Sequence, residues 1–210
     1  MKPYYDDGKG IVIYHGDCME IAPLVGQRDF IFADPPYGVG FQYANDADVR
    51  GGYVERISEW FALIGTTNAA ITPGIDNLCH WPQPRWVLAW LKANSMGASR
   101  LSGPKTVSRN QWEPILWYGS YPPNQTTDTI RTPIAITPPN GHPCPKPLEL
   151  LQKIVSFATN EGDTVLDPFL GSGTTLVAAK NLNRRAIGIE IEERYCEIAA
   201  ERLSQEVLAL

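Results

Sequence analysis

The chain has 210 residues, of which 43% are hydrophobic and 20% are charged, and its formal net charge is −5. This composition is typical of a folded soluble protein and excludes a disordered or low-complexity chain. No apolar run approaches the roughly 18–20 residues that span a bilayer, and the N-terminus lacks the apolar region of a signal peptide. Taken alone, the acidic balance counts against nucleic-acid binding, although the distribution of charge matters more than its sum.

The four cysteines, Cys18, Cys79, Cys144 and Cys196, are widely separated along the chain. Their spacing matches neither a disulfide framework nor a zinc site. We therefore expect reduced thiols in a cytoplasmic protein, with no bound metal and no membrane association.

Short strand-like segments alternate with helical ones, which predicts a single α/β domain over residues 1–210. The predicted strands span 11–14, 29–33, 68–72, 86–91, 114–118, 164–166 and 186–189. At least four helices are predicted, within 57–64, 146–158, 171–180 and 195–203. The Pro-, Thr- and Asn-rich segment 121–141 has no such pattern, and we expect a mobile loop there.

The first chemical motif is Asp34-Pro35-Pro36-Tyr37, which ends the second predicted strand. Ligands of open α/β sheets bind outside the carboxyl ends of strands. The Asp34 carboxylate and the Pro35 carbonyl suit the two hydrogens of an exocyclic amine, and the Tyr37 ring suits a flat base. The alternative is a proline-terminated strand followed by a core tyrosine.

The second motif runs from Asp167 to Thr175 and contains a glycine turn between a strand and a helix. Leu176 stands where the dinucleotide-binding fingerprint needs a small residue, and no P-loop lysine is present. Glu190 ends the next strand, where an acidic side chain commonly accepts the hydroxyls of a ribose. Together they favour a nucleoside site, although Glu190 could simply be an acid at a helix N-terminus.

Two shorter motifs are weaker. Asp17, in His15-Gly16-Asp17-Cys18, could accept from an adenine amino group or cap a helix. Lys146, in the Pro-rich segment 141–147, stands at a helix start, where a cation is unfavourable unless it faces an anion.

In these motifs the chain resembles the amino-group DNA methyltransferases that use S-adenosylmethionine. The catalytic tetrapeptide precedes the glycine turn, and this order resembles the β, or permuted, group of the family. The resemblance implies a Rossmann-like sheet of seven strands with one antiparallel edge strand and helices on both faces. It covers nearly the whole chain, with a target-recognition insertion at about 92–111.

The resemblance also implies residue roles. Asp34, Pro35, Pro36 and Tyr37 would hold the target base during catalysis. S-adenosylmethionine, which leaves as S-adenosylhomocysteine, would be bound by Asp17, Cys18, Asp34, His142, Lys146, Asp167, Phe169, Gly171, Ser172, Gly173, Thr174 and Glu190. Within this set, Asp17 would meet the cofactor adenine and Lys146 its carboxylate end. Cys144-Pro145 departs from the family pattern, in which relatives often have a Thr and a polar residue at these positions.

The segment from Arg85 to Gln111 carries five cations and no acid, and we expect it to contact DNA phosphates. The alternative is an ordinary solvated face. The predicted DNA-binding residues are Arg85, Lys92, Arg100, Lys105 and Arg109. The resemblance also suggests a homodimer and a restriction-modification or phage setting.

Adenine N6 is the expected target, because Asp at position 34 is typical of adenine enzymes in this family and Ser of cytosine-N4 enzymes. Cytosine N4 stays open, since both amines need the same pocket chemistry. Cytosine-C5 methylation would use Cys144 after Pro143 as a nucleophile. That cysteine would be expected after the strand that ends at Asp34-Pro35, and not beside the cofactor helix. A non-catalytic nucleic-acid-binding protein with this fold is the alternative from another class.

Overall fold

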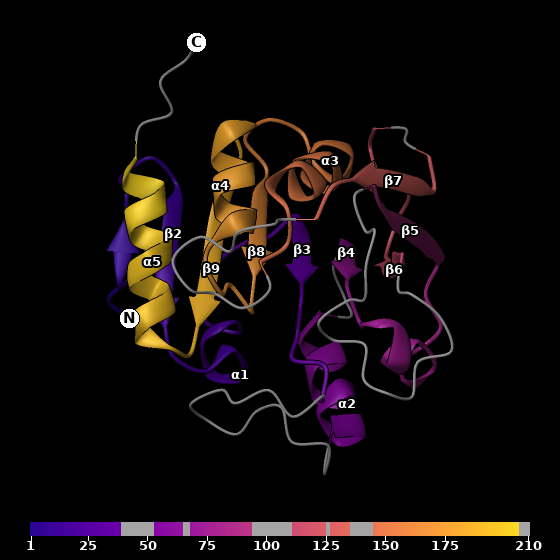
Figure 1. Ribbon diagram of the computed structural model, residues 1–210. Helices are drawn as coiled ribbons and strands as arrows, with labels where there is room; N and C mark the ends of the chain where they lie inside the picture. The colour runs from indigo at the N-terminus through magenta and orange to yellow at the C-terminus, as the bar shows by residue number, and fades with distance from the viewer. Residues whose placement is uncertain (39–52, 65–67, 94–110, 125–126, 135–144, 206–210) are drawn as a thin grey trace.

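The computed structural model describes residues 1–38, 53–64, 68–93, 111–124, 127–134 and 145–205. These residues form a mixed β-sheet with helices on both faces (Figure 1). The strands are β1 Tyr5–Asp6, β2 Ile11–His15, β3 Phe30–Ala33, β4 Asn68–Ile71, β5 Trp86–Lys92, β6 Trp112–Tyr118, β7 Thr129–Thr132, β8 Thr164–Asp167 and β9 Arg185–Glu190. The helices are α1 Cys18–Ile21, α2 Tyr53–Ile64, the 3₁₀ helix η1 Ile75–His80, α3 Leu148–Ala158, α4 Thr174–Asn181 and α5 Glu193–Ser204.

The described strands form one nine-stranded sheet in the order β1-β2-β9-β8-β3-β4-β6-β5-β7. The seven expected strands are all present, but β1 and β7 add two more. The β1 strand has only two residues, too few for a sequence pattern. An antiparallel strand is present at an edge, as expected, because β1 pairs antiparallel with β2. A second antiparallel strand, β6, lies inside the sheet between β4 and β5.

The segment 121–141 was expected to be a structureless loop, and part of that expectation is wrong. Residues 129–132 form β7, which pairs in parallel with β5. Ile130 of β7 is buried and Trp90 of β5 donates from Nε1 to Thr132 Oγ1 at 2.8 Å. This pairing and burial stabilise β7, although the Thr- and Pro-rich composition of the segment does not predict a strand.

Successive side chains along each strand point to opposite faces of the sheet, where they pack into two hydrophobic cores. Phe30 and Phe32 of β3 pack with α3, α4 and α5, whereas Ile31 and Ala33 pack with α1 and α2. The near-continuous apolar sequence of β3 follows from its burial on both faces. Among the described residues, no helix is long and apolar enough to cross a membrane.

The parallel strands β2, β9, β8, β3 and β4 all end at one edge of the sheet, the lower edge in Figure 1. A polar side chain stands at or just beyond the end of each of these strands. In sheet order these are Asp17, Glu190, Asp167, Asp34 and Thr72. The topology therefore gathers residues that are far apart in sequence at the edge where α/β proteins bind ligands.

Candidate active site

The Asp34 carboxylate is the centre of a hydrogen-bonded cluster at this edge. Its Oδ1 accepts from the Tyr37 hydroxyl at 2.6 Å and from Thr72 Oγ1 at 2.5 Å. Lys146 Nζ lies 2.7 Å from both carboxylate oxygens and 2.8 Å from the Tyr37 hydroxyl. The cluster joins one acid, one cation and two hydroxyls, and Asp34 is still partly exposed to solvent.

The local chain explains why Tyr37 is held beside Asp34. The Asn77 side-chain amide donates to the Tyr37 carbonyl at 2.8 Å. A Cβ added at Gly74 would lie 3.2 Å from the Tyr37 ring, so the ring packs directly on that backbone. Burial and the neighbouring Asp34 carboxylate raise the pKa of Tyr37 well above its usual value. The phenol is therefore a hydrogen-bond donor at neutral pH.

A second carboxylate, Glu113 at the start of β6, extends the cluster. Its Oε1 lies 2.5 Å from Lys92 Nζ, and its Oε2 lies 4.0 Å from Lys146 Nζ. Glu113 is only 9% exposed, and within the described residues its Oε2 has no hydrogen-bond partner. Sequence reasoning missed Glu113, because a single acid in an apolar strand gives no hint of the lysines that it faces.

Asp167 and Glu190 form an acidic pair at the ends of the neighbouring strands β8 and β9. Asp167 is 2% exposed and accepts from the Phe169 amide at 3.0 Å. Burial raises the pKa of Asp167 to about 7. Glu190 accepts from the amides of Gly171 at 2.7 Å and Glu192 at 2.9 Å, and burial raises its pKa as well.

The glycine turn owes its shape partly to helix α5. Gly173 has φ +82°, and a Cβ placed there would lie 2.7 Å from the Ala199 Cβ. Packing against α5 therefore explains the need for glycine at this position. Arg202, which the sequence did not single out, donates from Nη1 to the Ser172 carbonyl and to Thr174 Oγ1. Burial lowers the pKa of Arg202.

The other predicted cofactor residues have structural contacts of their own. Asp17 Oδ1 accepts from the Met19 amide at 2.8 Å and so caps α1. Cys18 is buried, and burial raises the pKa of its thiol to about 12. Phe169 packs edge-on against Trp60, with ring centroids 5.2 Å apart. His142 lies outside the described residues.

The two predicted DNA-binding cations that the structure describes lie far apart. Arg85 precedes β5 and Lys92 is its last residue, which places their backbones about 23 Å apart at about 3.3 Å per residue. Arg85 stacks on Tyr121, 4.1 Å from the ring centroid. The Lys92 side chain is only 7% exposed and is paired with Glu113, and its role as a phosphate contact stays a prediction. Arg100, Lys105 and Arg109 lie outside the described residues.

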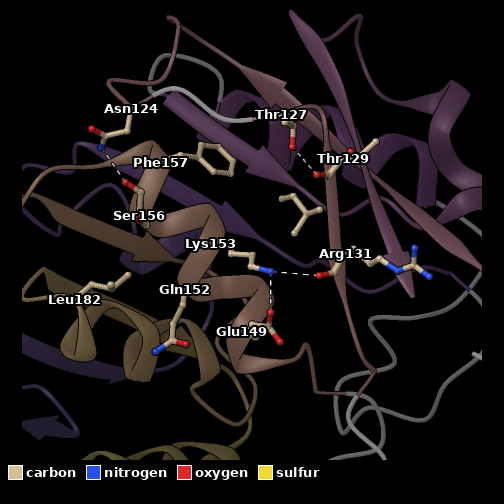
Figure 2. A pocket seen from close by; sticks show the side chains of 11 residues that line it. Asn124, Thr127, Thr129, Arg131, Glu149, Gln152, Lys153, Ser156, Phe157 and Leu182 are labelled. Carbon is tan, nitrogen blue, oxygen red and sulfur yellow. Dashed lines mark hydrogen bonds and ion pairs between the residues drawn. The ribbon is translucent and has the colours of Figure 1, made fainter. Parts of the chain in front are cut away.

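A hollow of about 690 Å³ lies away from these clusters, between α3 and β7 (Figure 2). Lys153 crosses its rim and bonds to Glu149 at 2.7 Å and to the Arg131 carbonyl at 3.3 Å. None of the predicted catalytic or cofactor residues lines it. The candidate site is therefore the carboxyl edge of the sheet and not this hollow.

The carboxyl edge of this mixed sheet carries the Asp34–Tyr37 cluster after β3 and the glycine turn after the neighbouring strand β8, which is a methyltransferase-like arrangement. The sequence profile of the N6/N4 DNA methylase family matches residues 83–201, which is more than half of the chain. The chain belongs to this family of DNA methylases.

Three relatives illustrate the family. The chain is 30% identical over 205 residues to the putative methylase YubD of Escherichia coli (strain K12), across 90% of this chain and 88% of YubD. It is 26% identical over 265 residues to the type II methyltransferase M.ScaI of Streptomyces caespitosus, across 100% of this chain and 86% of M.ScaI. The crystal structure of the M1.HpyAVI–SAM complex has a TM-score of 0.66 and 28% identity, over 92% of this chain and 98% of that one.

Proposed function

We propose that this DNA methylase transfers a methyl group from S-adenosylmethionine to the exocyclic N6 of an adenine that has left the DNA duplex. The observation that carries the proposal is the Asp34 cluster, where a partly exposed carboxylate already binds a nitrogen, the Lys146 ammonium, through both oxygens. A carboxylate placed in this way can equally accept hydrogen bonds from an amine of a base.

The acidic pair and the glycine turn fit the cofactor. S-adenosylmethionine supplies a methyl group on a sulfonium sulfur and carries an ammonium, a carboxylate and a ribose. Asp167 would hold the ammonium, because a buried carboxylate with a raised pKa gains most from a cationic partner. Glu190 would accept from the ribose hydroxyls, since each of its oxygens has lone pairs beyond those used by Gly171 and Glu192. Of the other members of the expected cofactor set, Phe169, Ser172, Gly173 and Thr174 would line the turn, with Asp17 and Cys18 beside it.

Catalysis would rest on positioning. The target amine donates one hydrogen to the Asp34 carboxylate and the other to the Pro35 carbonyl, which orients the nitrogen lone pair. Pro35 and Pro36 have no N–H to compete for these acceptors. As nitrogen becomes positive, the Asp34 charge stabilises it, and Asp34 then takes up the proton that the methylated nitrogen releases. Tyr37 would stack on the base.

DNA would be the macromolecular substrate, held by backbone contacts from the segment between β5 and β6. Arg100, Lys105 and Arg109 are the proposed phosphate contacts. The described ends of this segment, Lys92 and Trp112, lie at the edge of the sheet that carries Asp34. A homodimer and a restriction-modification partner remain part of this proposal.

The proposal is tested by incubating the protein with S-adenosylmethionine and DNA of mixed sequence and then digesting the DNA to nucleosides. Mass spectrometry should find N6-methyladenine. Asp34→Ala should lower the rate by roughly 10²–10³-fold or more while retaining cofactor binding by calorimetry. Asp76→Asn, an exposed acid in η1, is the matched control.

Other outcomes discriminate the alternatives. N4-methylcytosine as the product would overturn adenine as the target but leave the Asp34 mechanism intact. Cofactor binding without methylation of any DNA would favour a non-catalytic protein. Full activity in Asp34→Ala would refute the assigned role of the cluster.

A further inference from the structure

The ammonium of Lys146 occupies the acceptor that the target amine needs. It bonds to both oxygens of Asp34 at 2.7 Å and to the Tyr37 hydroxyl at 2.8 Å. With Thr72 also bound to Oδ1, the carboxylate has little acceptor capacity left for a further donor. A base entering this site must therefore displace Lys146 or share Asp34 with it.

Glu113 offers Lys146 a second place to bind. Its Oε2 lies 4.0 Å from Lys146 Nζ, is buried, and within the described residues accepts no hydrogen bond. A shift of Nζ by about 1.2 Å would bring the two atoms to the usual distance of a charge-assisted bond. Lys92 binds the other oxygen at 2.5 Å and so holds the carboxylate in this orientation.

We propose that Glu113 is a positioning residue that takes Lys146 from Asp34 when the target amine arrives. This inference rests on the proposed function, because it assumes that an amine of a base binds Asp34. In the absence of DNA, Lys146 neutralises Asp34. In its presence, Lys146 pairs with Glu113, and Asp34 accepts from the base and stabilises the positive charge that develops on nitrogen.

The charges of the four side chains support this exchange. Lys92 and Lys146 balance Asp34 and Glu113, so moving Lys146 between the two acids leaves the cluster neutral. If Lys146 simply left the cluster, two acids would share one cation in a mostly buried space, which is costly. A short movement between two acids avoids that cost.

The test is a double-mutant cycle in the full-length protein, with the Michaelis constant for DNA as the first readout. Glu113→Gln should raise this constant about tenfold, because Lys146 loses its charged acceptor and stays on Asp34. In the Lys146→Met background the same change should alter it by less than about twofold. Lys146→Met alone should lower the constant, and neither change should affect the dissociation constant for S-adenosylmethionine.

The matched control is the exposed pair Glu149 and Lys153 on α3, whose atoms lie 2.7 Å apart (Figure 2). Glu149→Gln and Lys153→Met should each leave the Michaelis constant unchanged. Urea unfolding of every variant checks that Glu113→Gln still folds. If Glu113→Gln does not fold, the test is the lower Michaelis constant for DNA that we expect for Lys146→Met. A tenfold higher Michaelis constant in that variant would overturn the proposal.

Two further results would overturn the proposal. An equal effect of Glu113→Gln in both Lys146 backgrounds would show that the glutamate acts only by anchoring Lys92. A loss of affinity for S-adenosylmethionine in Lys146→Met would indicate that Lys146 binds the cofactor carboxylate. Nitrogen-15 lysine spectra give a readout independent of activity: the Lys146 signal should move when a DNA duplex and the inhibitor sinefungin are added. If the wild type methylates no DNA, the proposed function fails, whereas these spectra still report whether Lys146 changes partner.

Discussion

Replacing Gly173 by alanine tests whether the glycine turn is shaped by helix packing. Gly173 has φ +82°, and an added Cβ would lie 2.7 Å from the Ala199 Cβ and 3.2 Å from its Cα. Gly162 has nearly the same φ, +81°, but an added Cβ there would meet nothing within 4 Å. The two glycines therefore separate the cost of the backbone conformation from the cost of the contact.

The expected magnitudes follow from this comparison. Gly162→Ala should reduce the free energy of unfolding by about 1 kcal/mol, the cost of a left-handed conformation for alanine. Gly173→Ala carries the same cost and an overpacking cost of about 1–3 kcal/mol, because α5 must move away from the turn. For a domain of this size, a loss of about 3 kcal/mol lowers the melting temperature by about 6–12 °C.

Urea and thermal unfolding of both variants give these numbers directly. Ala199→Gly removes the closest contact, so Gly173→Ala should cost less in that background than in the wild type. Equal losses for Gly173→Ala and Gly162→Ala would refute the packing explanation, and access of a ligand to the backbone would then account for glycine at this position.

Two other predictions concern buried polar groups. Because burial raises the pKa of Asp167 to about 7 from 3.8, the protonated group contributes stability near pH 4 that is lost as the pH rises through 7. In cofactor-free protein, Asp167→Asn should therefore make the unfolding free energy fall less between about pH 4 and pH 7. If urea unfolding shows the same dependence on pH in wild type and variant, burial of Asp167 is not the cause of this fall. Trp90→Phe removes the buried bond to Thr132 and should cost about 1–2 kcal/mol by urea unfolding. The exposed Trp86→Phe should stay within about 0.5 kcal/mol, and equal losses would argue against the bond.

Much of the fold could be predicted because its signals are local. The apolar runs of β3 and β8 and the helical spacing of apolar residues in α3 depend only on neighbouring residues. The places where prediction failed depend on distant partners. The β7 strand is stabilised by pairing with β5 and burial of Ile130, and the position of β6 inside the sheet is set by pairing across the chain.

The site divides in the same way. Asp34, Asp167 and Glu190 could be singled out because each ends a recognisable strand, and the topology brings such ends together. Which side chains touch could not be predicted. Lys146 was expected at the cofactor carboxylate, but the structure places it on Asp34, 112 positions away in the sequence. Arg202 reaches the glycine turn from the last described helix, and no local pattern indicates this contact.

The charge distribution also has a different meaning in the structure than in the sequence. The run of cations from Arg85 to Gln111 looked like one basic surface, but its two described cations do different things. Lys92 forms an ion pair with Glu113 inside the site, and Arg85 stacks on Tyr121 at the opposite end of β5. The other three cations of this run, Arg100, Lys105 and Arg109, follow Lys92 in the sequence and lie outside the described residues, so phosphate binding by them stays a prediction. Under the proposed positioning by Glu113, Lys92 contributes to binding of the target base, because it holds the Glu113 carboxylate that accepts Lys146.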